Sequence, residues 1–401
     1  MRTLIYPEWL VDGTGGPLRG GTGLAFGADG RIEMIGPENQ LSPGEGDVVV
    51  RAQRQTLLPG LINMHAHLTL ASDNAPIVPY VEAHSDVALA LRGAHNAAVS
   101  LRAGVTTVRD CGSRGRTVLD LRDAIARGLV QGSRILVAGS PITITGGHMR
   151  PFGGEADGVE GVRRMVRRLI SAGADFIKVA GSGGDTPGSL TEYPSFSLAE
   201  EKAVTETAHG LGRRVTVHCT ATTAIARAVE AGADSIEHGF FVGPGWAAAY
   251  DDALAERVAE RGISVTPTLQ VIRDTAEGLP PGGERDIWKR RREILLDHAG
   301  RLHRAGVRLT AGSDAGWRLT RFDTFWCELE ELVGCGLSAV EAIHAATGAA
   351  SVAAGQADQF GTLREGLRAD LVLVEGNAAQ DVRCLANVRA VYLEGRSVSL
   401  T

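Results

Sequence analysis

The sequence has few of the features that mark exported or membrane-spanning proteins. Its 401 residues include five cysteines, widely scattered and without a CxxC pair: Cys111, Cys219, Cys327, Cys335 and Cys384. Such a set argues against a disulfide framework and favours a reducing compartment, the cytoplasm. No run of about 20 apolar residues is present, which excludes a membrane-spanning helix. We also expect no export signal, because the segment MRTLIYPEWLVDG lacks an apolar core and a cleavage pattern.

A surplus of positive charge is also absent. The formal net charge is −6 and the isoelectric point is near 6.0, which argues against nucleic acid or an anionic membrane as a partner. The basic stretch Arg163, Arg164, Arg167 and Arg168 is typical of one solvated helix face. Apolar residues make up 44% and charged residues 22%, so the chain can bury a substantial core and has the composition of a globular protein.

The two ends of the chain consist of short apolar runs separated by tight turns. Residues 1–58 contain segments closed by Gly or Asp-Gly, and none has the length or period of a helix. Residues 360–401 follow the same pattern, in GTLREGLRADLVLVEG and VRAVYLEGRSVSL. Since neither end can hold a core alone, we predict that they pair into one small β-sandwich domain.

Residues 59–359 alternate between apolar runs and helical patterns. Continuous apolar runs are typical of strands buried on both faces of a parallel sheet. A helical pattern covers 159–173, and Ser197 with Glu200 predicts a capping box for another at 198–212. Strands that are each followed by a helix predict a (β/α)8 barrel domain. The eight predicted strands are 61–67, 104–111, 134–140, 175–181, 214–219, 234–239, 263–269 and 307–314.

Several of these strands carry side chains suited to metal chemistry. In a barrel of this kind the active site lies at the carboxyl ends of the strands. The first strand ends in a histidine pair, and the fourth, fifth, sixth and eighth each contribute one further side chain. The six candidates are His65, His67, Lys178, His218, His238 and Asp314.

The spacing of His65 and His67 favours a shared metal ion. Residues two apart in a strand point the same way, so both imidazoles can reach one ion at about 2.0–2.1 Å. An HxH pair alone is a weak signal and is compatible with two unrelated surface histidines. His218 and His238 at matching strand ends make the metal site the better interpretation.

Lys178 lies inside an apolar strand, where a cation is costly to bury. Such a lysine can lose its proton and react with CO2 to form a carbamate, an anion whose two oxygens can bridge two cations. The alternative is a buried salt bridge to Asp314 or Glu237.

Asp314 has two candidate roles. Its carboxylate can ligate a metal, and it can accept a proton from a metal-bridging water and pass it to the leaving group. The alternative is that Asp314 does not touch the metal and only contacts one of its ligands.

At this point the motifs carry a resemblance that extends over nearly the whole chain. The sequence resembles the amidohydrolase superfamily, and within it the imidazolonepropionase/prolidase-like branch, which includes Xaa-Pro dipeptidases and Arg/Lys carboxypeptidases. The matching segments are PGLINMHAHL (59–68), AGVTTVRDCG (103–112), TGGH (145–148), AGADFIKVAGSGG (172–184), VTVHCTA (215–221), SIEHG (235–239), TAGSDAG (310–316) and GTLREGLRADLVLV (361–374).

The resemblance implies a binuclear site with two divalent metal ions, usually zinc. It assigns His65 and His67 to the more buried metal, and His218 and His238 to the more exposed one. The implied bridge is a carboxylated Lys178, and Asp314 serves as ligand and proton shuttle. Manganese or iron remain open, because His and carboxylate sites accept several metals. The same two-domain plan is also implied.

The resemblance further implies a substrate-binding histidine after the third strand, at the place of His148, although a purely structural loop histidine is the alternative. Peptidase-like members often carry HAH or HAY at the fifth strand, whereas this chain has His218-Cys219-Thr220. The smaller Thr220 puts dipeptidase activity in doubt. We expect Arg150 near the pocket mouth, and Phe240 and Trp317 beside an apolar or aromatic part of the substrate.

These features predict a metal-dependent hydrolase that cleaves a C–N bond of a small molecule, in an amide, peptide-like, carbamate, urea or cyclic amide group. One alternative is a hydrolytic deaminase of a heterocycle, which generally works with one metal and lacks the lysine of the fourth strand. Another is a non-catalytic scaffold on the same fold, since fold alone does not prove activity.

The expected partner is a small-molecule substrate, with no nucleic acid and no membrane. A second copy of the chain is a further candidate, because WRLTRFDTFWCELEELV (317–333) can offer an exposed apolar helix.

Counting the bound metal separates these functions. We expect two zinc ions per chain after reconstitution with zinc and bicarbonate, measured by elemental analysis of the desalted protein. One ion per chain would favour the deaminase, and no binding at micromolar zinc would favour the scaffold.

Overall fold

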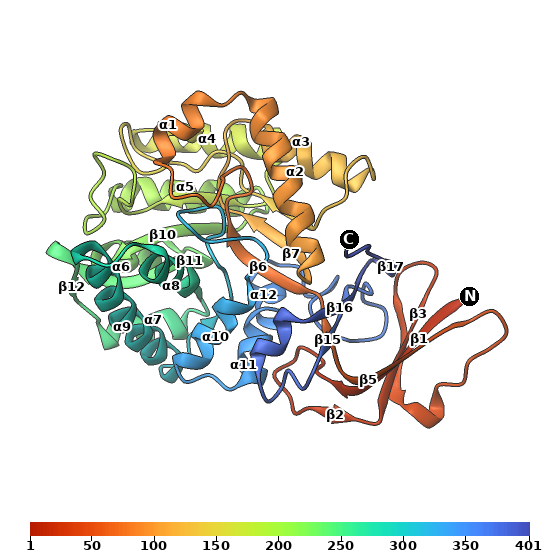
Figure 1. Ribbon diagram of the computed structural model, residues 1–401. Helices are drawn as coiled ribbons and strands as arrows, with labels where there is room; N and C mark the ends of the chain where they lie inside the picture. The colour runs from red at the N-terminus through yellow and green to blue at the C-terminus, as the bar shows by residue number, and fades with distance from the viewer.

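Strands from both ends of the chain share one sheet. The computed structural model describes residues 1–401, and Figure 1 shows this terminal sheet beside a helix-covered body. Strand β1 (Arg2–Leu10) runs parallel to β5 (Val48–Pro59), and β5 runs antiparallel to β15 (Leu371–Glu375). The remaining strands are β2 (Arg19–Gly20), β3 (Thr22–Gly27), β4 (Ile32–Pro37), β16 (Val388–Leu393) and β17 (Arg396–Ser397).

Hydrogen bonds join these eight strands in the order β17-β16-β15-β5-β1-β3-β4, with β2 beside β1. The pairing of the two chain ends therefore matches the expectation from the sequence. The strands form a single hydrogen-bonded sheet, so the sandwich of two packed layers stays a prediction. The domain limits 1–58 plus 360–401 and 59–359 also stay predictions.

All eight strands predicted for the middle of the chain are present. They divide into a three-stranded parallel sheet, β6-β7-β8, and a second sheet with the order β14-β13-β11-β10-β9. A short strand, β12 (Ala247–Ala248), pairs with β11. The strands are β6 (Leu61–Ala66), β7 (Val105–Asp110), β8 (Arg134–Val137), β9 (Ile177–Ala180), β10 (Val215–Ala221), β11 (Ser235–Gly243), β13 (Ser264–Thr266) and β14 (Arg308–Leu309).

The two parallel sheets approach each other at both edges without merging into one continuous sheet. At one edge an isolated bridge pairs Ile142, beyond β8, with Val179 of β9. At the other, Ala66 at the end of β6 pairs with Ala315, beyond β14. The architecture is therefore a mixed α/β fold whose parallel strands form two arcs, and ladder pairing does not run unbroken around a closed ring.

Helices separate successive parallel strands and cover them on the outside (Figure 1). The first ones are α1 (Ile77–Ala83), α2 (Asp86–Arg102), α3 (Thr117–Ala126), α4 (Gly158–Ala172), α5 (Leu198–Gly210) and α6 (Thr222–Ala231). The later ones are α7 (Asp252–Glu260), α8 (Leu269–Gly278), α9 (Gly283–Arg304), α10 (Trp326–Gly334), α11 (Ala339–Ala345) and α12 (Gly348–Ala353).

Local chemistry sets the ends of several helices. The capping box predicted for α5 is present: the Ser197 hydroxyl accepts from the backbone N–H of Glu200, whose carboxylate accepts from the N–H of Ser197. Helix α4 ends at Gly173, whose φ of +103° places it in the left-handed region that glycine adopts without strain. These signals explain why the predicted helix limits hold.

The prediction that 317–333 offers an exposed apolar helix is wrong. Phe325, Leu329 and Leu332 are 0–2% exposed, and the apolar face of α10 packs inside the chain. Glu331 of α10 accepts hydrogen bonds from Arg292 of α9, which ties the two helices together. The segment thus closes the body of the protein, and association with a second copy stays a prediction without this surface.

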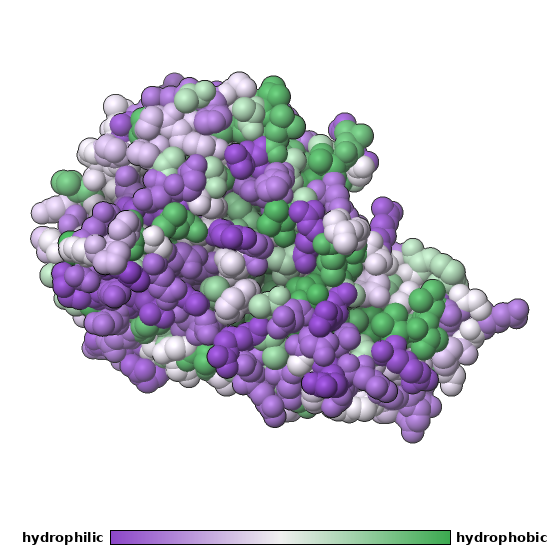
Figure 2. All heavy atoms as spheres, viewed as in Figure 1, coloured by the Kyte–Doolittle hydropathy of each residue, from purple (hydrophilic) through white to green (hydrophobic).

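The main apolar core joins the body to the terminal sheet. A cluster of 71 buried apolar residues fills the body and includes Leu58, Val372 and Val374 of the terminal sheet. A second cluster, of 12 residues, holds further side chains of the terminal sheet. On the face seen in Figure 2, hydrophilic residues cover most of the helical body. None of the helices combines the length and the hydropathy that crossing a membrane requires.

Gly312 lies where the ends of β6 and β14 approach most closely. A Cβ atom there would lie 2.4 Å from Cγ2 of Thr266 and 2.8 Å from the backbone nitrogen of His65. We expect Gly312→Ala to lower the free energy of unfolding by about 1–3 kcal/mol, because the backbone must shift to remove these overlaps. Urea denaturation would measure this, with Gly210→Ala as the control, since a Cβ atom there meets nothing within 4 Å. Equal stability of both variants would contradict the close approach.

Candidate metal centre and active site

One cavity at the carboxyl ends of the parallel strands brings the predicted ligands together. The space it encloses, together with the solvent at its open mouth, is about 600 Å³. All six candidates are 0–6% exposed and line it: His65, His67, Lys178, His218, His238 and Asp314. The topology thus collects side chains that are separated by up to 249 positions, 314 − 65, in the sequence.

Hydrogen bonds between the ends of β6 and β14 position three of these side chains. The N–H of Asp314 donates to the carbonyl of His65 at 2.8 Å, and the N–H of His67 donates to the carbonyl of Ala315 at 2.8 Å. Asn63, on the same face of β6, donates from Nδ2 to the Ser313 hydroxyl at 2.7 Å and accepts the Ser313 N–H at 3.0 Å. These bonds hold Asp314 opposite the histidine pair.

A buried carboxylate orients His65. Oε2 of Glu237 lies 2.7 Å from Nδ1 of His65, and Oε1 accepts from Nη1 of Arg109 at 2.8 Å. The Arg109 guanidinium lies over the Phe176 ring at 4.2 Å. This arrangement leaves Nε2 of His65 free to face the cavity, as expected for a metal-binding imidazole held from behind.

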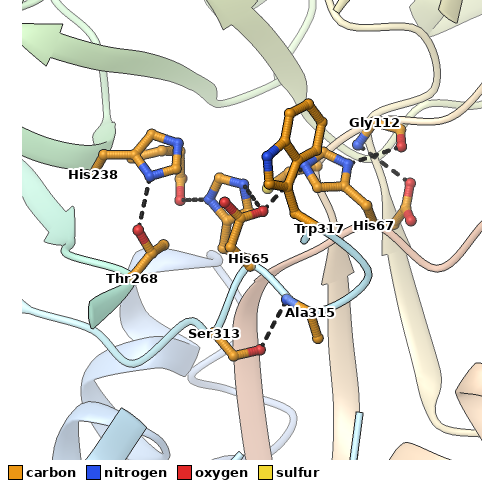
Figure 3. Close-up of polar contacts among 12 residues, drawn as sticks. His65, His67, Gly112, His238, Thr268, Ser313, Ala315 and Trp317 are labelled. Carbon is orange, nitrogen blue, oxygen red and sulfur yellow. Dashed lines mark hydrogen bonds and ion pairs between the residues drawn. The ribbon is translucent and has the colours of Figure 1, made fainter. Parts of the chain in front are cut away.

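The other three histidines are also held through one ring nitrogen, as Figure 3 shows for His67 and His238. Nδ1 of His67 lies 3.1 Å from the carbonyl oxygen of Gly112, and Nδ1 of His238 lies 2.8 Å from the Thr268 hydroxyl. Nε2 of His218 lies 3.0 Å from the carbonyl oxygen of Gly183. In each ring the second nitrogen stays available to a metal ion.

Two groups of side chains have donor atoms close enough to share a metal ion. In the first, Nε2 of His65 and Nε2 of His67 each lie 3.5 Å from Oδ1 of Asp314. The second joins His65 with Cys111 and Glu237. In that group Glu237 is already bound to Arg109, and burial raises the pKa of the Cys111 thiol to about 12, so it holds its proton. The first group is therefore the better metal site.

Burial keeps the imidazoles neutral. Desolvation, with the nearby Lys178 cation as a further cause, lowers the pKa of His65 well below its ordinary 6.5. Burial likewise lowers the pKa of His67 to about 3 and places the pKa of His218 and His238 well below 6.5. A neutral imidazole is the form that binds a metal ion, so these four side chains are ready to bind at neutral pH.

The Lys178 amine has no compensating partner. The side chain is 0% exposed, and its Nζ has no hydrogen-bond partner. It forms no ion pair with Asp314 or Glu237, so the salt bridge considered for it is wrong. A buried cation without a counter-ion is costly, and the site is therefore chemically incomplete around this amine.

Asp314 is equally unusual. Burial raises its pKa from 3.8 to about 7, and its Oδ1 has no hydrogen-bond partner. Asp314 and His238 have φ values of +58° and +70°, a left-handed conformation that is uncommon outside glycine. Such strain costs about 1–3 kcal/mol per residue and clusters at functional sites.

His148 lies beside the four histidines. Its ring centroid is 4.5 Å from that of His218, and burial lowers its pKa to about 4. Its Nδ1 lies 2.9 Å from the Thr186 hydroxyl, whose oxygen also accepts the Met149 N–H at 3.0 Å. The Thr186 proton is then best donated to Nδ1, which leaves His148 with an N–H at Nε2.

The other substrate-contact predictions have mixed outcomes. Thr220, Phe240 and Trp317 line the cavity. The Thr220 hydroxyl is already bound to the Ser182 hydroxyl and the Thr191 carbonyl, so its role is local. Arg150 is not among the residues that line the cavity, and its guanidinium donates to the Pro187 carbonyl at 2.8 Å. Its position near the pocket mouth and its contact with substrate stay predictions.

Several residues at the site were not predicted as functional from the sequence. Arg318, Trp246 and Trp288 line the cavity, and Glu237 with Arg109 supports it from behind. An acidic residue within the apolar run DSIEHG was a signal for Glu237, since a buried carboxylate requires a partner. Trp246 and Trp288 come from segments outside the strands and gave no comparable signal.

Comparison with known proteins gives similar sequences and similar structures. The model of the amidohydrolase family matches residues 56–398. Ochratoxinase from Aspergillus niger is 28% identical, over 97% of this chain and 84% of its own. Imidazolonepropionase from Symbiobacterium thermophilum is 26% identical, over 91% and 88%. The crystal structure of a Xaa-Pro dipeptidase with bound methionine in the active site superposes with a TM-score of 0.87 and 29% identity, over 99% of this chain and 100% of its own.

The fold and the clustered histidines thus define a hydrolase of the amidohydrolase type. The chain belongs to the amidohydrolase family, and the hydrolases among its relatives make it an enzyme that acts on carbon–nitrogen bonds. The resemblance to the imidazolonepropionase/prolidase-like branch is confirmed.

The Glu237 carboxylate should stabilise the fold. Its buried pair with Arg109, the positive charge of the nearby Lys178 and the hydrogen bond from Thr216 outweigh burial and hold its pKa below the ordinary 4.5. We expect Glu237→Gln to lower the free energy of unfolding of the metal-free protein by about 3–5 kcal/mol at pH 7, because Arg109 loses its counter-ion. Chemical denaturation of EDTA-treated protein would measure this.

A carboxylate with a lowered pKa contributes stability above about pH 4.5 and loses it as the pH falls through its folded-state pKa. The difference in the free energy of unfolding between wild type and Glu237→Gln should therefore become smaller as the pH falls below about 4.5. Glu256→Gln, at an exposed position of α7, is the matched control. A difference in the free energy of unfolding that grows as the pH falls would contradict a stabilising role for the Glu237 carboxylate.

Proposed function

We propose that the protein is a binuclear metal-dependent amidohydrolase that cleaves a C–N bond of a small molecule. The observation that carries the proposal is the fully buried Lys178 amine without a partner, in the wall of a cavity shared with four neutral histidines and Asp314. After the ammonium has lost one proton to solvent, the neutral amine could add CO2 and release a second proton, giving a carbamate anion whose charge two divalent ions would balance.

The donors of the cavity fit two divalent ions. His65 and His67 would hold one ion together with Asp314, since their Nε2 atoms face the same carboxylate oxygen. His218 and His238 would hold the second ion, and the Lys178 carbamate would join both. Four imidazoles with carboxylate-type oxygens favour zinc, although other transition metals accept such ligands.

The bound metals would supply an activated water and polarise the scissile carbonyl. Asp314 would hold the proton released by that water and deliver it to the leaving nitrogen, a task open to a carboxylate that faces the histidine pair. The Nε2–H of His148 would donate to the carbonyl oxygen and to the charge that develops there.

The relatives indicate the range of bonds to test. They include an ochratoxinase, an imidazolonepropionase and a Xaa-Pro dipeptidase. We propose that amides, peptide-like bonds, carbamates, ureas and cyclic amides are the candidate substrates. A single-metal deaminase would leave Lys178 without a role, and a scaffold would not need all six donors.

The arrangement of the parallel strands indicates the architecture of the body. We propose that the two arcs of parallel strands correspond to a (β/α)8 barrel, with the terminal sheet as the second domain.

Five unpaired cysteines are compatible with a reducing compartment, and the cytoplasm remains our expectation.

Asp314→Asn tests the proton-transfer role. We expect the variant to retain bound zinc while kcat falls by about 10²–10⁴, since the amide cannot carry the proton. The assay is a screen of N-acyl amino acids, dipeptides, carbamates and ureas against enzyme reconstituted with zinc and bicarbonate, with elemental analysis of each sample. Asp297→Asn, at an exposed position of α9, is the control. Unchanged turnover in Asp314→Asn would refute the role.

A further inference from the structure

An aromatic wall of three side chains leads away from the histidine cluster. Between ring centroids, Phe240 lies 5.3 Å from His238 and 5.9 Å from Trp246. Trp246 in turn lies 6.4 Å from Trp288. Phe240, Trp246 and Trp288 all line the cavity. The cavity therefore offers ring surface to any part of a substrate that extends beyond the candidate metal centre.

An unusual backbone places Trp246 in this wall. Trp246 ends the short helix η3 (Pro244–Trp246) with a φ of +61°, directly after Gly245 at +71°. A bulky residue in the left-handed region is an outlier, and it persists only where the surrounding contacts hold it. Trp246 is only half-buried, so burial of the ring is not enough to explain its position.

The contact that holds the Trp246 ring comes from Arg291 of α9. Its guanidinium carbon lies 3.8 Å from the centroid of Trp246 and 4.7 Å from that of Trp288. Both tryptophans line the cavity but Arg291 does not, so the guanidinium packs behind the two rings. Burial lowers the pKa of Arg291 from 12.5, and the nearby Asp185 and Glu192 oppose this effect. The cation thus has acidic neighbours within the protein and needs no anion from a substrate.

We propose that Trp246 selects amides whose arm ends in a flat, neutral aromatic group remote from the scissile bond, and that Arg291 positions Trp246 for this contact. The proposal rests on the proposed function, because the amide must lie at the histidine cluster. An aromatic ring gains stacking or edge contacts with the indole in addition to the burial of its apolar area. A saturated ring of similar size gains the burial alone.

The test changes only the outer ring of an elongated substrate. One pair is N-(biphenyl-4-ylmethyl)acetamide and N-(4-cyclohexylbenzyl)acetamide, and a second pair carries the same rings on the acyl side, as the N-methylamides of biphenyl-4-ylacetic and 4-cyclohexylphenylacetic acid. The ratio of kcat/KM is read from the pair that the zinc-loaded enzyme turns over faster. We expect the biphenyl member to be favoured about threefold to tenfold, mostly through KM, which is the factor that an aromatic pair contributes beyond area.

Variants at two positions test which residues carry this preference. Trp246→Leu should bring the ratio to about one, and Trp246→Phe, which keeps a ring, should retain part of it. Arg291→Met keeps both tryptophans and should lower the ratio at least twofold, because the Trp246 ring loses its support. The matched control is Trp326→Leu, since Trp326 is also half-buried and lies under an arginine, Arg273, at 5.9 Å, but does not line the cavity.

Three results would count against the proposal. A wild-type ratio near one, or a wild-type preference that persists in Trp246→Leu, would overturn the role of Trp246. A ratio that is unchanged in Arg291→Met would overturn the positioning role of Arg291. A merely structural role for either side chain would lower activity on both members of a pair equally and leave the ratio as it is in wild type.

A binding measurement separates this proposal from the proposed function. The probes are 4-(biphenyl-4-yl)butan-2-one and 4-(4-cyclohexylphenyl)butan-2-one, ketones without a C–N bond to cleave, titrated into the zinc-loaded protein by calorimetry. We expect the biphenyl ketone to bind about threefold to tenfold more tightly to wild type, and both ketones to bind equally to Trp246→Leu. Selective binding without hydrolysis of any amide would refute the proposed function alone. Hydrolysis of amides without selective binding would refute the role of Trp246 alone.

Discussion

The structure depends on the junction between the first and the last strand of the parallel body. Backbone hydrogen bonds between His65, His67, Asp314 and Ala315, supported by Asn63 and Ser313, join the end of β6 to the segment beyond β14. Because these bonds involve the backbone on both sides of each side chain, they determine where the side chains point. The candidate metal centre is a consequence of this junction.

Electrostatics explains why the junction needs a ligand. Burial favours the neutral form of each histidine and raises the pKa of Asp314 to about 7, while the Lys178 amine has no counter-ion. In most of a protein interior, such groups are paired or absent. In this fold the buried groups stay without partners, and the backbone at His238 and Asp314 keeps a strained left-handed conformation. A site of this kind is preorganised for charged cofactors and is expensive to maintain without them.

The outer part of the cavity is built from other elements and from apolar contacts. Near the histidines, the contacts are between polar side chains held by the strands, whereas further out the tryptophans come from η3 (Pro244–Trp246), α9 and the loop after β14. Loops and helix faces vary in their packing more than the strands that support them. The tertiary structure thus joins two kinds of surface in one cavity, a polar end at the histidines and an aromatic wall beyond it.

The sequence by itself determined the parallel strands, several of the helices, the pairing of the chain ends and the six candidate ligands. Each of these rests on local information: unbroken apolar runs, a capping box, and a polar residue where a buried strand ends. Only the tertiary structure decided which side chains stand behind the ligands, such as Glu237 with Arg109. It also decided that 317–333 is buried, that Arg150 points to Pro187, and that Arg291 meets Trp246. These depend on contacts between segments far apart in the chain, and the pattern along a single segment holds no information about its partner.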